Sequence, residues 1–89
     1  MAWTIEFSEL ANKQIDKLDP AVARRILDFL KNRALTAEDP SSLATRLKGT
    51  ENTGRWRYRV GDYRIVVSFD NSIITIYVIE IGHRREIYR

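Results

Sequence analysis

The first 18 residues combine two patterns of hydrophobic and polar positions. Trp3, Ile5 and Phe7 alternate with polar residues, as in a half-buried strand. Ser8 follows, and its hydroxyl suits the N-terminal cap of a helix. Apolar residues then recur every three or four positions, which predicts a short helix with one apolar face.

Asp19 and Pro20 predict the start of a second helix, because aspartate caps helices and proline suits the first helical position. Apolar positions at helical spacing extend it over about residues 20–35, so the two helices form a hairpin with a tight connection. Residues 36–53 are rich in Thr, Ser, Asp, Asn, Gly and Pro and predict a long loop, a feature that is often functional. Two leucines are expected to attach this loop to the core: Leu43 and Leu47.

Alternating segments in the last part of the chain predict three strands, over residues 55–60, 63–69 and 73–81. Gly61-Asp62 is typical of a two-residue hairpin turn, and Gly82 is expected to end the last strand. The order of elements is β-α-α-β-β-β. It predicts an α+β fold with one domain over residues 1–89, in which the helical hairpin packs on one face of a small antiparallel sheet.

A two-residue turn fixes which side chains of the hairpin share a face. Val60 faces Tyr63 and Arg59 faces Arg64, since side chains alternate across a strand. One face is apolar and is expected to cover the helices: Trp56, Tyr58, Val60, Tyr63, Ile65, Val67 and Phe69. The opposite face carries the arginines: Arg55, Arg57, Arg59 and Arg64. Like charges repel across a sheet, so we expect a polyanion to supply negative charge; a solvated face balanced by distant acids is the alternative.

The distribution of charge supports an anion-binding surface more strongly than the net charge of +3 does. Residues 1–53 carry equal numbers of basic and acidic side chains, whereas residues 54–89 carry seven arginines, no lysine and four acids. Arginine offers a planar fork of donors that suits phosphate, so nucleic acid is the leading candidate ligand. The chain has no cysteine, no signal-peptide pattern and no apolar run that would span a bilayer, and we expect a cytoplasmic protein without membrane association.

The segment after the last strand adds two groups that can move protons. His83 is the chain's one imidazole and Tyr88 offers a phenol. A turn after Gly82 would bring Arg84 and Tyr88 back beside the arginines of the hairpin. A lone histidine is more often structural than catalytic, and a tyrosine near the C-terminus is more often a packing residue. The residues alone leave both alternatives open.

Three segments resemble the RelE toxins of bacterial toxin–antitoxin systems, within the RelE/ParE superfamily: L-K-G at 47–49, R-x-R-V-G-D-Y-R at 57–64 and G-H-R-R-E-I-Y at 82–88. The resemblance covers the whole chain in the order of its elements. It implies an endoribonuclease that cleaves mRNA in the ribosomal A site without a metal or cofactor. The residues expected to act in catalysis are Arg57, Arg64, Arg84 and Tyr88, and those expected to contact RNA are Arg55, Arg59, His83 and Arg85.

Within this resemblance Tyr88 is the candidate general base, and nearby guanidinium groups would have to lower its pKa from the usual value of about 10. His83 ranks second. The implied partners are the ribosome, mRNA and a RelB-like antitoxin, acidic and amphipathic, which forms a hetero-oligomer with the toxin and covers the arginines or displaces the tail. Two alternatives stay open: a ParE-like inhibitor of DNA gyrase, and an inactive module of the same fold that binds RNA or a partner.

Overall fold

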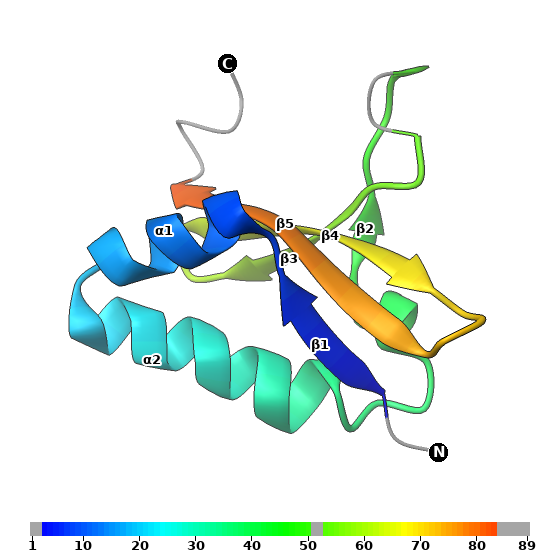
Figure 1. The fold of residues 1–89 in the computed structure, drawn as a ribbon, viewed down its shortest axis with the longest axis horizontal. Helices are drawn as coiled ribbons and strands as arrows, with labels where there is room; N and C mark the ends of the chain where they lie inside the picture. Colours follow the sequence, from blue (N-terminus) through cyan, green and yellow to red (C-terminus); the bar gives the residue numbers. More distant parts are fainter. Residues whose placement is uncertain (1–2, 51–52, 84–89) are drawn as a thin grey trace.

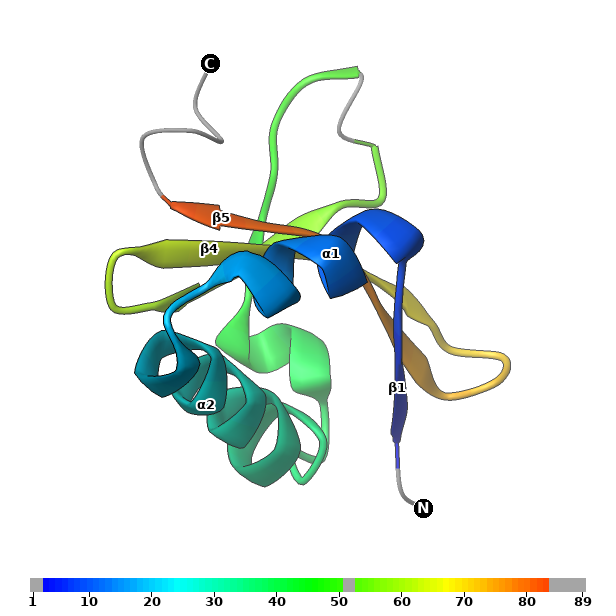
Figure 2. The ribbon, with the colours of Figure 1, turned by 60° about the vertical axis from the view of Figure 1, so that its left-hand side comes forward.

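The computed structural model describes residues 3–50 and 53–83, which form two helices packed on a five-stranded sheet. The elements are β1 (Thr4–Phe7), α1 (Glu9–Lys17), α2 (Pro20–Phe29), β2 (Thr45–Arg46), β3 (Trp56–Val60), β4 (Tyr63–Asp70) and β5 (Thr75–His83). The order of strands is β1-β5-β4-β3-β2. Figures 1 and 2 show α1 and α2 on the same side of this sheet. The predicted α+β fold is confirmed.

Helix α1 begins where Ser8 caps it and also ties it to β5. The Ser8 hydroxyl oxygen accepts a 2.9 Å hydrogen bond from the backbone N–H of Ala11, and the hydroxyl donates a 2.6 Å bond to the carbonyl of Ile79. Further along the helix, Gln14 accepts a 2.6 Å bond from the backbone N–H of Ile81. The helix is therefore fastened at two places to the strand beneath it, and the predicted cap is confirmed.

Helix α2 begins as its sequence predicts and ends in a wider turn. The carboxylate of Asp19 accepts a 2.9 Å hydrogen bond from the N–H of Ala21, and Pro20 occupies the first turn. After Phe29 the chain continues as a π-helical turn over residues 30–34, closed by a 2.9 Å bond from the N–H of Leu35 to the carbonyl of Leu30. In the described part of the chain, no helix has the length and apolar character needed to cross a membrane.

The β3–β4 hairpin has the predicted register, and its apolar face forms the centre of the core. Val60 pairs with Tyr63, Arg59 with Arg64 and Tyr58 with Ile65. Gly61 takes φ +59° in the turn, a conformation that favours glycine. Ring contacts join both layers, such as Phe29 against Tyr58 with centroids 5.2 Å apart. The buried core includes Ile26, Leu30, Tyr58, Ile65, Val67, Ile76, Val78 and Ile81.

The sheet differs from the prediction in two respects. It is mixed rather than wholly antiparallel, because β1 pairs in parallel with β5, Thr4 opposite Thr75. β5 also runs two residues past Ile81, because Gly82 pairs with Arg64 and continues the ladder instead of ending it. The connection between these two parallel strands is long, as a parallel pair requires, and contains both helices and β2, β3 and β4.

The prediction of an unstructured loop over residues 36–53 is wrong. A 3₁₀ turn over Pro40–Leu43 is held by the hydroxyl of Tyr58, which donates a buried 2.8 Å hydrogen bond to the carbonyl of Pro40. The short strand β2 then pairs with β3. Leu47 is half-buried, but Leu43 is 39% exposed, so the expected attachment through Leu43 is wrong and buried Pro40 takes its place.

Candidate functional site

The side of β3 that faces away from the helices is lined with arginine. Tyr58 is fully buried in the core between the sheet and the helices, so its neighbours Arg57 and Arg59 belong to the opposite face. Arg64 is the cross-strand partner of Arg59 and lies on the same face. We call the surface formed by Arg57, Arg59 and Arg64 the arginine face. Arg55 directly precedes β3 and is exposed.

Exposure differs strongly among these arginines. Arg59 is exposed and Arg57 is half-buried, whereas Arg64 is only 3% exposed. β4 is the central strand of the sheet, and the partner of Arg64 on its other side is Gly82, which contributes no side chain there. The predicted register places Arg64 on this face, but its side chain is buried there, unlike those of Arg57 and Arg59. Its positive charge lies beneath the surface and not on it.

The half-buried position of Arg57 changes its electrostatics. Partial burial, and secondly the nearby charge of Arg59, lower the pKa of Arg57 from its usual range. Both effects penalise the cationic form, and the attraction of an approaching anion offsets them. Arginine nevertheless stays protonated at neutral pH. The arginine face thus holds cations close together in the absence of a ligand, an arrangement that favours binding of a phosphate group.

A β-bulge brings a carboxylate onto the arginine face. Val66 pairs with Glu80 and Val67 pairs with Val78, so β5 has one extra residue, Ile79, between them. Glu80 follows the bulge and lies beside Val66, whose other cross-strand neighbour is Arg57. The carbonyl of Ile79 is the one that accepts the Ser8 hydroxyl, so the start of α1 holds the bulge in place. Sequence reasoning missed Glu80, because strict alternation does not reveal the bulge.

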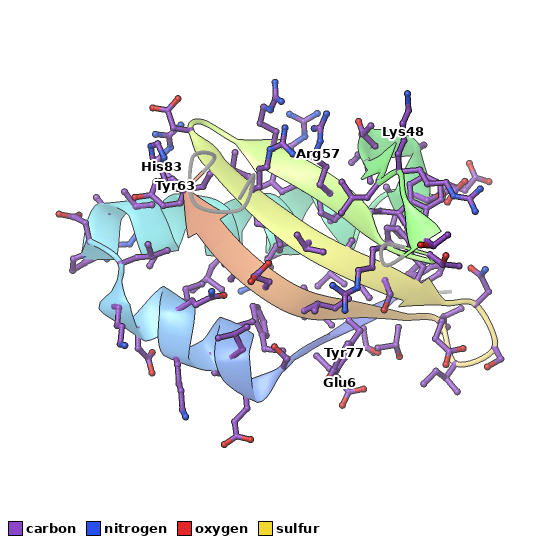
Figure 3. All side chains as sticks on the ribbon, turned by 90° about the horizontal axis from the view of Figure 1, so that it is seen from above. Glu6, Lys48, Arg57, Tyr63, Tyr77 and His83 are labelled. Atoms are coloured by element: carbon purple, nitrogen blue, oxygen red, sulfur yellow. The ribbon has the colours of Figure 1, made fainter. Side chains whose placement is uncertain are left out.

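Lys48 is a second residue that sequence reasoning did not select. A 2.9 Å hydrogen bond from the N–H of Leu47 to the carbonyl of Arg55 extends the pairing between β2 and β3. It brings the chain around Lys48 alongside the beginning of β3. Figure 3 shows Lys48 and Arg57 over the same border of the sheet, with Glu6 and Tyr77 at the opposite border. The signal available in the sequence was the L-K-G segment itself.

His83 lies near the arginine face but on the other side of the sheet. Its cross-strand partner is Tyr63, and the two rings meet edge to face with centroids 5.4 Å apart. Both line a cavity of about 290 Å³ together with Gln14 and Lys17 of α1. Figure 3 shows Tyr63 and His83 side by side at one end of the sheet. The structure does not bring His83 together with Arg57, and it separates the histidine from the predicted cluster. Arg84, Arg85 and Tyr88 lie outside the described residues.

The model of a protein family matches nearly the whole chain. The family is described as "ParE toxin of type II toxin-antitoxin system, parDE", and the match covers residues 5–88. The chain belongs to the RelE/ParE superfamily of type II toxins. Toxin RelG of Mycobacterium tuberculosis is 26% identical to this toxin over 89 residues, which cover all of this chain and 99% of that protein.

Solved structures confirm the fold of the toxin. The toxin–antitoxin complex RelBE2 of M. tuberculosis contains a chain with TM-score 0.83 and 21% identity, covering 94% of this toxin and 100% of that chain. The RelE–RelB complex of Pyrococcus horikoshii gives TM-score 0.68 at 25% identity, with 94% and 97% of the two chains covered. The intact RelBE complex of Escherichia coli gives TM-score 0.73 at 20% identity, with 92% of this toxin and 96% of that chain covered. The resemblance stated from the sequence is thus confirmed at the level of the superfamily.

Proposed function

We propose that this toxin is a ribosome-dependent endoribonuclease, which cleaves mRNA in the A site and so inhibits translation. The observation that carries the proposal is the arginine face, where Arg57, Arg59 and Arg64 lie together on the side of the sheet away from the helices. Phosphoryl transfer needs stabilisation of charge on the phosphate oxygens more than it needs an unusual acid. A cluster of fixed guanidinium groups supplies that stabilisation without a metal or cofactor.

In the proposed reaction, the 2′-oxygen of the ribose forms a bond to phosphorus while the bond from phosphorus to the 5′-oxygen breaks. The products are a 2′,3′-cyclic phosphate and a free 5′-hydroxyl. Arg57 contacts a non-bridging oxygen from the surface, and the buried charge of Arg64 acts from beneath. Arg55 and Arg59, both exposed, hold the neighbouring phosphates, with Arg85 as a further contact to RNA.

Tyr88, as the phenolate, accepts the proton of the 2′-hydroxyl in this proposal. Arg84 stabilises charge on the leaving 5′-oxygen, which takes a proton from water to become the 5′-hydroxyl. Both assignments rest on the resemblance to RelE toxins in the segment 82–88. A phenol has a pKa of about 10, so the guanidinium groups around it must favour the phenolate. A site with few conventional acids and bases suits an enzyme that relies on the ribosome to orient the mRNA.

An antitoxin of the RelB type is the proposed partner in the cell. The similar structures from M. tuberculosis, P. horikoshii and E. coli are complexes of a toxin with its antitoxin. This toxin carries a net charge of +3, and an acidic, amphipathic partner would complement that charge. The toxin and antitoxin together form a hetero-oligomer in this proposal.

Inhibition of DNA gyrase is the second candidate function, because the matching family model is described as that of ParE. What favours RNA cleavage over it is the combination of Arg57, Arg64, Arg84 and Tyr88, a set that ParE-like toxins generally lack. An inactive binding module is the third candidate.

Single-turnover cleavage on programmed ribosomes, read by primer extension, tests the proposal. Wild-type toxin should cut mRNA inside A-site codons. Tyr88→Phe should bind ribosomes normally but cleave about 10²–10⁴-fold more slowly, the range for a positioned proton-transfer group. Full-rate cleavage by Tyr88→Phe would remove the tyrosine from the mechanism. Absence of cleavage by the wild type, with inhibition of purified gyrase, would assign the ParE-like function instead.

A further inference from the structure

Tyr77 is a large aromatic residue that lies outside the core. It stands on β5 between Ile76 and Val78, both fully buried, so its side chain points to the side of the sheet away from the helices. This is the side that carries the arginine face. Tyr77 is 42% exposed there, and Figure 3 shows it at the border of the sheet opposite Arg57.

The ring of Tyr77 makes no contact with another ring in the described part of the chain. The two other tyrosines of this part, Tyr58 and Tyr63, pack edge to face against aromatic neighbours. The direct neighbours of Tyr77 in the sheet are Ser68 on β4, which is small, and Glu6 on β1, which is exposed. The aromatic side chain is therefore accessible to a ligand.

Tyr77 differs in its position from the other exposed large apolar residues of the described chain. Leu10 and Leu27 belong to the helices on the far side of the sheet, and Leu43 and Ile73 lie in turns. Among these residues Tyr77 is the one that belongs to a strand and shares a sheet surface with the arginines. Proteins that bind unpaired bases combine a positively charged surface with aromatic rings on which the bases stack. The uncovered side of this sheet provides both parts.

The register places Tyr77 at a suitable distance from the arginines. Its partner Ser68 lies two residues beyond Val66, which is the cross-strand neighbour of Arg57. Two strand spacings of about 4.8 Å and two residues of about 3.4 Å therefore separate the backbones of Tyr77 and Arg57, a distance of about 12 Å. A nucleotide whose phosphate contacts the long side chain of Arg57 can place its own base, or that of the next nucleotide, over the ring.

Glu6 provides a hydrogen-bond acceptor beside the ring. It is the direct partner of Tyr77 across the parallel pair of β1 and β5, and Figure 3 shows the two residues together. A carboxylate repels phosphate but accepts hydrogen bonds from the amino groups of bases, as it does from N4 of cytosine. Uracil carries no amino group. The two side chains together therefore favour a base other than uracil.

We propose that Tyr77 and Glu6 form a subsite for one unpaired base of the A-site codon, which is cytosine, adenine or guanine rather than uracil. The proposal rests on the RNA substrate proposed above and gives that substrate a source of codon preference. The base stacks on the ring of Tyr77 and donates a hydrogen bond from its amino group to the carboxylate of Glu6. A neighbouring phosphate stays on Arg57. The subsite acts in binding and takes no part in proton transfer.

Binding to an mRNA that cannot be cleaved tests the subsite apart from catalysis. The probe is a ribosome programmed with an mRNA whose A-site codon consists of 2′-deoxyribonucleotides, which lack the attacking hydroxyl. One base of this codon at a time is replaced by an abasic residue. One of these replacements should weaken binding of the wild-type toxin by about 5–150-fold, the range for stacking of a base on an aromatic side chain.

Variants of Tyr77 show whether the lost base is the one that stacks on its ring. Tyr77→Leu keeps the apolar bulk but removes the aromatic ring, so the same abasic replacement should hardly change its binding. Tyr77→Phe keeps the ring and should behave as the wild type does. Both substitutions are at an exposed position, and thermal unfolding of each variant checks that the fold is retained.

The four bases at the responsive codon position test the contribution of Glu6. The wild-type toxin should bind uracil about 5–150-fold more weakly than the favoured base, the range for a good hydrogen-bonded contact to a base edge. Glu6→Gln should lose most of this preference, because an amide also offers a donor to uracil. Glu9→Gln removes the same charge from α1 and should keep the preference, since exposed Glu9 lies outside the subsite.

Several results would overturn the subsite. These are equal effects of the abasic codon on the wild type and Tyr77→Leu, equal base preference of the wild type and Glu6→Gln, or no binding of the wild type to ribosomes. Loss of binding by Tyr77→Leu that does not depend on the codon would assign the ring to ribosomal RNA instead. A toxin that binds with these preferences but never cuts ordinary mRNA would refute the proposed cleavage and leave the subsite intact.

Discussion

Arg59 and Arg64 are direct cross-strand partners, one exposed and the other 3% exposed. Two like charges in this relationship destabilise a sheet. A protein selected only for stability would place an acid at one of the two positions. The pair is consistent with a surface that favours anion binding although it lowers the stability of the fold.

Arg59→Glu should therefore stabilise the fold while weakening function. Replacing a like-charged pair by an opposite-charged one should raise the free energy of unfolding by about 0.2–1 kcal/mol. Chemical denaturation measures this gain, and ribosome binding measures the accompanying loss of affinity. Arg55→Glu is the control: Arg55 precedes β3 and has no arginine partner in the ladder, so its reversal should weaken binding without stabilising. A destabilised Arg59→Glu protein would contradict the electrostatic account.

Arg57→Ala should reduce the salt dependence of RNA binding. Each phosphate contact on single-stranded RNA contributes a slope of about −0.7 to log K against log salt concentration. Loss of one contact should flatten the slope by that amount. Arg33→Ala is a suitable control, because Arg33 lies over the ring of Phe29 next to α2, away from the arginine face. Equal slopes for wild type and Arg57→Ala would show that Arg57 makes no phosphate contact.

His83→Phe should separate binding from proton transfer. A phenyl ring preserves the edge-to-face contact with Tyr63 and removes the imidazole. Because His83 lies across the sheet from Arg57, we expect only a small loss of cleavage rate at saturation. Removal of a proton-transfer group would instead slow cleavage by roughly 10²–10⁴-fold. The pH–rate profile between about pH 5 and 8, where histidine titrates, should also keep its shape. A changed profile would place His83 in the mechanism.

Tyr58→Phe should destabilise the protein at neutral pH by about 1–3 kcal/mol, because the buried carbonyl of Pro40 loses its hydrogen bond. Burial, and secondly the charge of Asp39, raise the pKa of Tyr58. A raised folded-state pKa means that the stability from the neutral phenol is complete below the unfolded pKa of about 10 and is lost as pH rises above it. The stability gap between wild type and variant should therefore narrow in alkali. Urea denaturation at a series of pH values measures it.

The hairpin shows what the sequence could predict. Strict alternation on both sides of Gly61-Asp62 leaves one register that buries Tyr58 and Ile65 together, because a shift by one residue would turn every side chain to the other face. The arginines of β3 follow from that register. Burial of Arg64 does not follow, because it depends on the strands that flank β4 on both sides.

β5 shows why the rest could not be predicted. Val78 and Ile81 both face the core although they lie three positions apart, which an unbroken strand does not allow. The bulge that permits it depends on Ser8, a residue far away in the sequence. For the same reason, the position of Glu80 beside Val66 was not accessible from a local pattern. The parallel partnership of β1 likewise depends on long-range pairing.

The pairing of Thr4 with Thr75 also sets when the toxin can become active during its synthesis. β1 has β5 as its partner in the sheet, and the bulge that shapes the arginine face is made of β5 and held by Ser8. A nascent chain that lacks residues 75–83 lacks β5, and with it the strand that joins β1 to β4 and the bulge beside the arginine face. Contacts between distant parts of a chain form late in folding. The toxin can therefore complete its fold only after its last strand has emerged from the ribosome that makes it.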